Sequence, residues 1–267
     1  MALYIVPVPI GNLRDITLRA VDILNSVDFI IAEDTRHSLK LLNSLGIKKR
    51  LYSYYKPKEE EKSREILRLL ERQSGALITD SGTPLISDPG GVLVRKAIEK
   101  GVEVISLPGP TAFVPALTNS GLKTDRFLFI GFPPRKGGKL RTFLEESAGT
   151  EFTLIFYESP RRVEAFLEAA AEIFGNRRFS LSKELTKKNE RVIRGYLPDF
   201  RELLAGVKLL GEFVIVIEGA EESPSGGRPE LNTVDDIYNY FRTSHGISRN
   251  QIKKILQKRN EPVSDHE

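Results

Sequence analysis

The sequence has no cysteine and no tryptophan, and it contains only one methionine and three histidines in 267 residues. The absence of cysteine excludes disulfide bonds, thiolate metal ligands and a cysteine nucleophile. The three histidines, His37, His245 and His266, are too few for a histidine-rich metal site. We therefore expect a protein that binds no metal.

Long hydrophobic runs are also missing. No apolar stretch approaches the roughly 18 residues that a membrane-spanning helix needs. The segment Met1–Val6 lacks a basic region followed by a long apolar run, so it reads as a first strand rather than a signal peptide. Hydrophobic residues nevertheless make up 40% of the chain, which is enough to form a core. The sequence predicts a folded, cytoplasmic protein without a membrane partner.

The net charge is only +4, from 40 basic and 36 acidic residues, but part of the excess is concentrated in two patches. The first consists of Arg135, Lys136, Lys139 and Arg141. The second contains Arg249, Lys253, Lys254, Lys258 and Arg259, with no acidic residue between them. Such patches are typical of surfaces that bind RNA, although an ordinary solvated surface is an equally good interpretation. We treat both patches as candidate RNA-binding sites.

The first half of the chain alternates between strand and helix patterns. Strands are predicted at Leu3–Val6, Val27–Ala32, Ala76–Thr79 and Glu103–Leu107. Between them, apolar residues recur at helical spacing, for example over Ile16–Val27 and up to Leu45, where Gly46 follows as a helix end. This alternation predicts an α/β fold with a mainly parallel sheet covered on both faces.

A second α/β unit is predicted to begin near Lys123. Its strands are expected at Arg126–Gly131, Phe152–Tyr157, Phe179–Ser182 and Phe213–Glu218. Ser159 is predicted to cap a helix whose first residue is Pro160 and which ends at Gly175.

The end of the chain differs in composition from the two α/β units. A segment rich in serine, glycine and proline predicts a linker, and two short helices, Val234–Phe241 and Ser248–Lys258, predict a small helical tail. We therefore expect a first α/β domain over residues 1–122, a second over 123–219, a linker over 220–230 and the tail over 231–267.

Ligands of open α/β sheets bind beyond the carboxyl ends of the strands, and the loops at these positions are rich in glycine, proline and carboxylates. Phosphate-loop, dinucleotide-loop and nucleophile-elbow motifs are absent. Candidate catalytic residues at the strand ends are Glu33, Asp34, Asp80, Glu158, Glu184 and Lys187. Lys187 would act as a base with a depressed pKa. Pairing of Asp34 with Arg36, and of Glu184 with Lys187, is an equally good structural interpretation.

Seven segments in unbroken order carry a family resemblance. They are Leu3–Leu13, Ala32–His37, Asp80–Gly90, Leu107–Pro110, Phe156–Pro160, Glu184–Lys187 and Gly211–Phe213. Together they resemble the tetrapyrrole methylase superfamily, and most closely its bacterial branch that 2′-O-methylates a cytidine of 16S rRNA in the small ribosomal subunit. Asn12 stands where tetrapyrrole C-methylases usually have aspartate, which favours the RNA branch.

The resemblance implies a fold of two α/β domains, with the methyl donor S-adenosylmethionine held in the cleft between them. It also implies a homodimer, the absence of a metal, and 16S rRNA or the small ribosomal subunit as partner. The residues that it assigns to the donor site are Ile10, Asp80, Gly82, Thr83, Ile86, Thr111, Ala112, Tyr157, Leu185 and Phe213. A histidine-rich stretch usual in the RNA branch is replaced by Tyr54–Glu59, which leaves the general base open.

Two other functions remain possible at this point. One is a C-methyltransferase acting on a porphyrin or corrin, against which Asn12 and the basic patch at residues 135–141 argue. The other is a non-enzymatic RNA-binding protein that uses Ser248–Lys258. That function would leave the strand-end loops unexplained.

Overall fold

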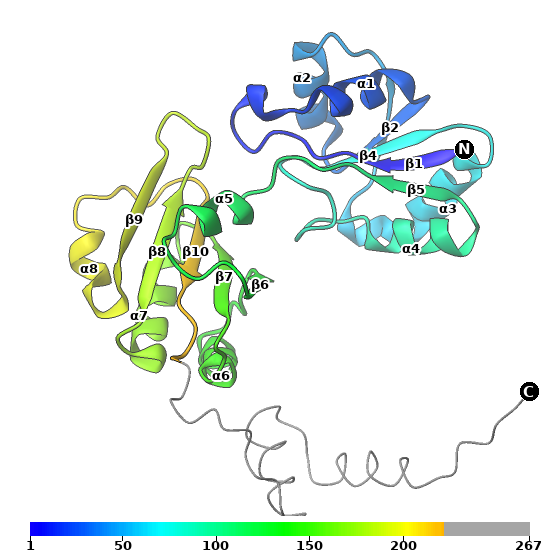
Figure 1. Cartoon of the computed structure of the whole chain (residues 1–267). Coiled ribbons are helices and arrows are strands. Elements are labelled where there is room, and N and C mark those ends of the chain that lie inside the picture. Colours follow the sequence, from blue (N-terminus) through cyan, green and yellow to red (C-terminus); the bar gives the residue numbers. More distant parts are fainter. Residues whose placement is uncertain (222–267) are drawn as a thin grey trace, which may run out of the picture.

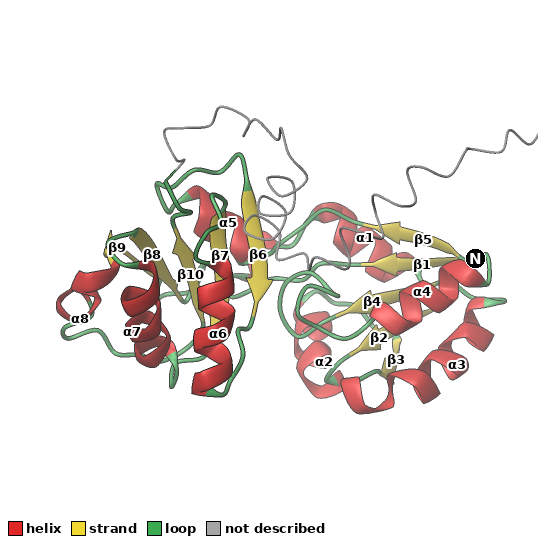
Figure 2. Ribbon diagram, turned by 90° about the horizontal axis from the view of Figure 1, so that it is seen from below, coloured by secondary structure: helices red, strands yellow, loops and turns green. Residues whose placement is uncertain are grey.

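The computed structural model describes residues 1–221, which form two five-stranded sheets (Figures 1 and 2). The predicted linker lies almost entirely outside the described residues. The same holds for the whole predicted tail, including the candidate RNA-binding residues Arg249, Lys253 and Lys254. The chain completes the first sheet before it begins the second.

The first sheet is parallel throughout, as predicted. Its strands are β1 (Ala2–Ile5), β2 (Phe29–Ala32), β3 (Arg50–Ser53), β4 (Gly75–Ile78) and β5 (Glu103–Ser106), in the order β3-β2-β4-β1-β5. Helices α1 (Leu18–Ser26) and α2 (Thr35–Ser44) pack on one face, and α3 (Glu59–Leu70) and α4 (Gly91–Glu99) on the other. The sheet is therefore buried on both faces, and the loops that follow its strands lie together at their carboxyl ends.

The second sheet is mixed. Its strands are β6 (Phe127–Gly131), β7 (Thr153–Glu158), β8 (Arg178–Lys183), β9 (Arg191–Tyr196) and β10 (Phe213–Ile217), in the order β6-β7-β10-β8-β9. Only β6 and β7 pair in parallel, and the other three pairs are antiparallel. β10, the last strand in the described chain, thus lies at the centre of the sheet.

Helices cover both faces of the second sheet unequally. α6 (Gly137–Ser147), α7 (Val163–Phe174) and α8 (Phe200–Leu203) pack on one face with a large apolar core. The other face is covered by α5 (Phe113–Thr118) and by Ile10 of the first unit. α5 therefore packs on the second sheet, although it precedes the predicted domain boundary after residue 122.

Two local predictions are wrong. Helix α7 begins at Val163 rather than at Pro160, and the Ser159 side chain does not cap it. Instead the Ser159 carbonyl accepts hydrogen bonds from the backbone N–H groups of Arg162 (2.9 Å) and Val163 (3.2 Å), which makes residues 159–162 a turn. The Ser159 N–H donates a hydrogen bond to the Glu158 carboxylate at 2.7 Å. The helix ends at Gly175 as predicted, with φ of 66°.

Two features are absent from residues 1–221. No helix there combines the length and the apolar character needed to cross a bilayer. Nor does that part of the chain hold three or more histidine, cysteine, aspartate or glutamate side chains grouped to bind a metal ion.

Candidate functional site

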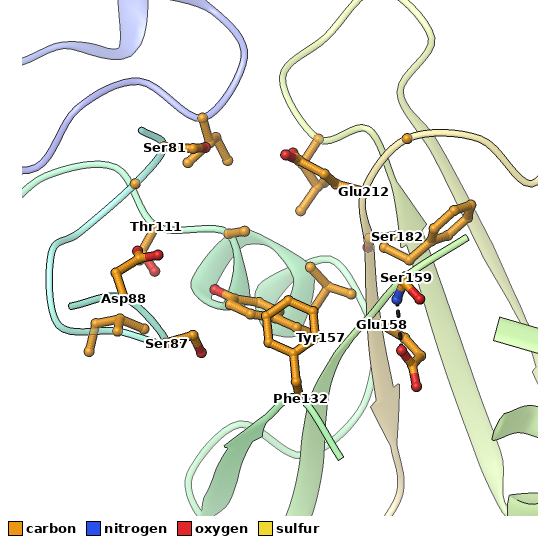
Figure 3. Close-up of a pocket in the computed structure, with 18 of the residues that line it drawn as sticks. Ser81, Ser87, Asp88, Thr111, Phe132, Tyr157, Glu158, Ser159, Ser182 and Glu212 are labelled. Atoms are coloured by element: carbon orange, nitrogen blue, oxygen red, sulfur yellow. Dashed lines mark hydrogen bonds between the residues drawn. The ribbon is translucent and has the colours of Figure 1, made fainter. Parts of the chain in front are cut away.

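A cavity of about 340 Å³ lies between the two sheets, a size typical of small-molecule sites (Figure 3). The first unit contributes the loops that follow β1, β4 and β5, and the second contributes the ends of β6, β7 and β8 and the start of β10. The cavity is lined by Ile10, Ser81, Gly82, Thr83, Ile86, Ser87, Asp88, Thr111, Ala112, Phe132, Tyr157, Glu158, Ser159, Pro160, Ser182, Leu185, Gly211, Glu212, Phe213 and Val214.

The loops of the first unit are joined to one another by short hydrogen bonds. Val8 and Gly82 exchange backbone hydrogen bonds of 2.9 and 3.0 Å, and the Thr83 hydroxyl donates to the Pro110 carbonyl at 2.8 Å. Gly82 has φ of 83°, and a Cβ atom there would lie 3.3 Å from Cγ2 of Ile10. This position therefore requires glycine for its backbone conformation, and it leaves little room for a side chain on the cavity wall.

Backbone strain is concentrated beside the cavity. Among the described residues, the four non-glycine residues with positive φ are Leu85 (73°), Ser87 (72°), Glu184 (50°) and Thr186 (67°). The first two flank the lining residue Ile86, and the last two flank the lining residue Leu185. Such conformations cost on the order of 1–3 kcal/mol each and are common at ligand sites. Each of the two loops thus fixes one apolar wall residue, Ile86 from the first unit and Leu185 from the second.

The two units touch directly next to the cavity. A Cβ atom on Gly11, in the loop after β1, would overlap the side-chain stem of Lys187 and lie 2.9 Å from the Thr186 hydroxyl oxygen. The loop after β8 therefore packs against the loop after β1 at a distance that only glycine permits.

The wall of the second unit is aromatic. The Phe113 ring stacks on Phe129 with centroids 4.7 Å apart, and Phe129 makes a T-shaped contact with Tyr157 with centroids 5.0 Å apart. Phe132 in turn contacts Tyr157 edge-on at 5.7 Å. Burial raises the pKa of the Tyr157 hydroxyl, which is opposed by a hydrogen bond with Thr111. Tyr157 is therefore a neutral wall residue fixed from both sides.

Carboxylates gather on the side of the first unit. Burial raises the pKa of Asp88 to about 6, a hydrogen bond with Thr79 opposes the rise, and the nearby charges of Glu33 and Asp80 add to it. Burial and the Asp80 charge also raise the pKa of Glu33, whose carboxylate accepts a hydrogen bond from the Thr79 hydroxyl at 3.3 Å. Lys56 is the cation that acts against these shifts. Asp88 is the member of this acidic cluster that lines the cavity, and sequence analysis did not single it out.

Nine of the ten predicted donor-site residues lie together on the cavity wall. The tenth, Asp80, is not a lining residue. Its carboxylate accepts a hydrogen bond from the backbone N–H of Asp34 at 3.2 Å and so ties the loop after β4 to the loop after β2.

Most of the predicted catalytic residues have structural partners and do not line the cavity. Asp34 caps α2 through the Arg36 N–H at 2.8 Å and pairs with the Arg36 side chain at 3.3 Å. Hydrogen bonds from Arg36 lower the pKa of Asp34. Glu33 belongs to the acidic cluster behind Asp88 and is likewise absent from the wall.

The depressed pKa predicted for Lys187 is contradicted. Lys187 pairs with Glu184 at 3.0 Å and with Glu212 at 2.9 Å. Burial works against its charge, but the hydrogen bonds with Glu212 and Glu184 outweigh burial and raise the pKa of Lys187. These ion pairs favour a structural role for Lys187, with Glu184 as one of its two partners.

Glu158 lines the cavity, but its carboxylate is already bound by neighbouring groups of the protein. The side chain is fully buried, pairs with Arg162 at 2.8 Å and accepts the Ser159 N–H (Figure 3). Arg162 also donates to the carbonyls of Pro133 (3.3 Å) and Pro134 (2.8 Å). Burial raises the pKa of Glu158, and the hydrogen bond from the Ser159 N–H and the charge of Arg162 oppose this rise. Glu158 and Arg162 therefore fix the loop after β6.

The first basic patch follows that loop. Arg135, Lys136 and Lys139 are exposed at the start of α6. Arg141 is engaged in an ion pair with Glu172 of α7. Three of the four residues of the patch therefore present their charge beside the cavity-lining segment at Phe132.

Comparison with known proteins gives three kinds of match. A family described as Tetrapyrrole (Corrin/Porphyrin) Methylases matches residues 2–200. The Ribosomal RNA small subunit methyltransferase I of Halalkalibacterium halodurans is 41% identical over 98% of this chain and 92% of that protein. The proteins of the same name from Micromonospora olivasterospora and Bacillus subtilis are 44% and 38% identical over 96% and 97% of this chain, and over 81% and 90% of their own lengths.

The fold also matches a solved structure. The crystal structure of uroporphyrin-III-C-methyltransferase from Thermus thermophilus aligns with a TM-score of 0.57 at 20% identity. The alignment covers 81% of this chain and 94% of that one. At this identity the likeness concerns the fold alone.

Proposed function

Because the chain belongs to the tetrapyrrole (corrin/porphyrin) methylase family, we propose that it is an S-adenosylmethionine-dependent methyltransferase acting on RNA of the small ribosomal subunit. The observation that carries the proposal is the cavity between the two units, where nine predicted donor-site residues meet. The near full-length relatives, named as ribosomal RNA methyltransferases, support the choice of acceptor.

The residues of the cavity fit the methyl donor. Ile10, Ile86, Leu185 and Phe213 offer apolar walls, while Gly82 allows the backbone to approach a ligand closely. When bound, S-adenosylmethionine supplies an electrophilic methyl group on a positively charged sulfur. An apolar wall suits this methyl group because it presents no competing nucleophile.

Asp88 suits the positive charge of the donor. Glu158 is committed to Arg162, and Glu212 to Lys187, whereas Asp88 faces the carboxylates of Glu33 and Asp80 across Thr79. A cation entering the cavity would be attracted to this acidic cluster and would favour the ionised form of Asp88. We assign Asp88 to charge recognition of the donor.

For the acceptor we propose the 2′-hydroxyl of a cytidine ribose in 16S rRNA, as in the branch that the sequence resembles most. Arg135, Lys136 and Lys139 lie where RNA phosphates would meet the protein next to the cavity. We further propose a homodimer that works in the cytoplasm, with a division into two domains near residue 122.

The proposal is tested with purified protein, labelled S-adenosylmethionine and small ribosomal subunits from a bacterium that lacks the corresponding methylation. We expect the label in 16S rRNA, and nuclease digestion with mass spectrometry should map it to the ribose of one cytidine. Incubation with a uroporphyrin-type tetrapyrrole is the matched control and should give no product. Labelled tetrapyrrole with unlabelled RNA would replace this function by the tetrapyrrole C-methyltransferase, and donor-free RNA binding without any product would favour a binding protein.

A further inference from the structure

Phe132 is the most exposed aromatic side chain on the cavity wall. Its exposed fraction is 59%, whereas those of the wall residues Ile10, Leu185 and Phe213 are 9%, 6% and 2%. Figure 3 shows its ring in front of Tyr157, between the first-unit residues Ser87 and Asp88 and the second-unit strands. An aromatic ring left in water at the edge of a cavity offers an apolar face to a ligand.

The ring is held from behind. It makes a T-shaped contact with Tyr157, with ring centroids 5.7 Å apart and ring planes at 65°, and the centroid of Tyr157 lies 5.0 Å from that of Phe129. This contact leaves a face of the Phe132 ring available for stacking. Because the ring is already supported before a ligand arrives, stacking on it costs little ordering of the protein.

The backbone after Phe132 is equally well fixed. The two carbonyls of Pro133 and Pro134 accept hydrogen bonds from Arg162, whose charge is balanced by the buried Glu158. Proline restricts the backbone at both positions. The ion pair of Glu158 and Arg162 therefore positions both the ring that precedes the prolines and the cations that follow them.

The order of groups along this segment matches the chemistry of a nucleotide. An exposed flat ring is followed within a few residues by the cations Arg135, Lys136 and Lys139. Nucleobases of unpaired RNA stack on aromatic side chains, while phosphates bind arginine and lysine. A ribose between a stacked base and bound phosphates would lie close to the cavity that Phe132 lines.

We propose that Phe132 is the stacking platform for the base of the nucleotide that is methylated, which leaves the RNA stack and lies on the exposed face of the ring. The flanking phosphates bind Arg135, Lys136 and Lys139, and the ribose faces the cavity. This inference rests on the proposed function, because it requires RNA as the acceptor.

The first test compares Phe132→Tyr with Phe132→Leu and Phe132→Ala in methylation of small ribosomal subunits. Loss of a stacked base costs roughly 5- to 150-fold in binding, so we expect KM for RNA to rise in that range for Leu and Ala. Phe132→Tyr should restore most of the activity. The affinity for S-adenosylmethionine, measured by calorimetry, should not change. Ile98→Ala on α4, where the side chain is 62% exposed and not part of the wall, is the control for removing a surface apolar group.

The second test uses the absence of tryptophan from the chain. Phe132→Trp creates a single fluorescent reporter, and a base stacked on the indole should quench its emission. The probe is a single-stranded RNA fragment around the mapped methylated nucleotide, added without donor. Tyr196→Trp on β9, at a 45% exposed position away from the cavity, is the control and should not be quenched.

The outcomes separate this inference from the proposed function. Full activity of Phe132→Leu in an enzyme that methylates rRNA would overturn the stacking platform alone. Quenching of Phe132→Trp by S-adenosylmethionine alone, with a parallel loss of donor affinity in Phe132→Ala, would also overturn it and assign Phe132 to the donor. A wild-type protein that transfers no methyl group to rRNA would overturn the proposed function and this inference together.

Discussion

Asp88 of the first unit and Glu158 of the second line the same cavity, and burial raises the pKa of both carboxylates, yet their neighbours differ. Glu158 faces the guanidinium of Arg162, which compensates its charge within the fold. Asp88 faces Glu33 and Asp80, which make its ionisation costly. A half-buried carboxylate among like charges is a group that the ligand, rather than the fold, has to compensate.

Replacing Asp88 by asparagine should therefore stabilise the protein without donor. The pKa of Asp88 is about 6 in the folded state and roughly 3.9 when unfolded, so its contribution to stability is full below pH 4 and is lost as the pH rises through 6. We expect Asp88→Asn to be about 1–3 kcal/mol more stable than wild type at pH 8 and equal near pH 4, measured by urea unfolding.

The same variant should bind the donor differently. Wild-type affinity should increase as the pH rises through 6, because ionised Asp88 attracts the cation. The affinity of Asp88→Asn should be weaker at pH 8 and independent of pH over this range. Calorimetry at several pH values checks both points, and an unchanged pH dependence in the variant would remove Asp88 from donor recognition.

Arg162 gives the opposite case. Arg162→Met leaves the fully buried Glu158 carboxylate without its cation, which should cost about 3–5 kcal/mol of unfolding free energy at neutral pH. The loss should shrink at low pH, since protonation of Glu158 removes the uncompensated charge. The double variant Glu158→Gln with Arg162→Met should recover most of the stability.

The control for this prediction is Arg201→Met. Arg201 pairs with Glu168 on the surface, where both side chains are more than half exposed, so its loss should cost less than about 1 kcal/mol. Equal losses from the buried and the surface pair would contradict the structural role of Arg162.

At the scale of elements, the loop after β4 determines the shape of the cavity. Gly82→Ala should lower stability by about 1–2 kcal/mol because an L-residue is strained at φ of 83°, and it should also weaken donor binding because the Cβ narrows the wall at Ile10. Gly82→Leu should abolish binding while the sheet remains folded. Both effects are measured by calorimetry and circular dichroism.

Gly46→Ala separates the two effects. Gly46 has φ of 71°, but a Cβ atom there would meet no atom within 4 Å. This control should lose similar stability and keep full donor affinity. Undiminished donor affinity in a folded Gly82→Leu variant would place the donor elsewhere.

The elements show how far the sequence predicts the fold. Strands buried on both faces, such as β4 and β10, were predicted because they are continuous apolar runs. β3 and β9 were missed, since both are edge strands made largely of polar or partly exposed residues. Edge strands form because a neighbouring strand offers free hydrogen-bonding groups, which is a tertiary effect.

In the candidate site, too, local features were predicted and tertiary ones were missed. Positions such as Thr83 and Leu185 followed from motifs that are contiguous in the sequence. Asp88 lies within the segment Asp80–Gly90, but its raised pKa depends on burial in the folded protein and on the charge of Glu33, which follows β2. The wrong prediction for the pKa of Lys187 has the same origin, because its partner Glu212 lies 25 residues away in the chain.

At the scale of the whole molecule, charge is distributed locally rather than globally. The net charge of +4 is modest, so attraction of RNA should depend on the exposed patch beside the cavity. Exchange of Arg135 and Lys136 for glutamate should weaken RNA binding and reduce the slope of log affinity against log salt by about 1.5, because fewer counterions are released. Donor affinity should be unaffected.

The matched control makes the same charge change beside α3 and α4, away from the first basic patch. Arg72 and Lys100 are exposed beyond α3 and α4, so their exchange for glutamate alters the net charge equally. Salt titrations of RNA binding should show a much smaller change in slope. Equal changes for both pairs would mean that only the overall charge matters.

The central place of β10 has a consequence for the growing polypeptide. The first sheet can close once residue 106 has been synthesised, but β7 and β8 lack the strand between them until residue 217 is available. At 5–20 residues per second this interval of about 110 residues lasts roughly 5–20 s on the ribosome. During it the inner edges of β7 and β8 have no partner in the second sheet, and the start of β10 that closes the cavity does not yet exist. The proposed donor can therefore stabilise the fold only after β10 has been synthesised.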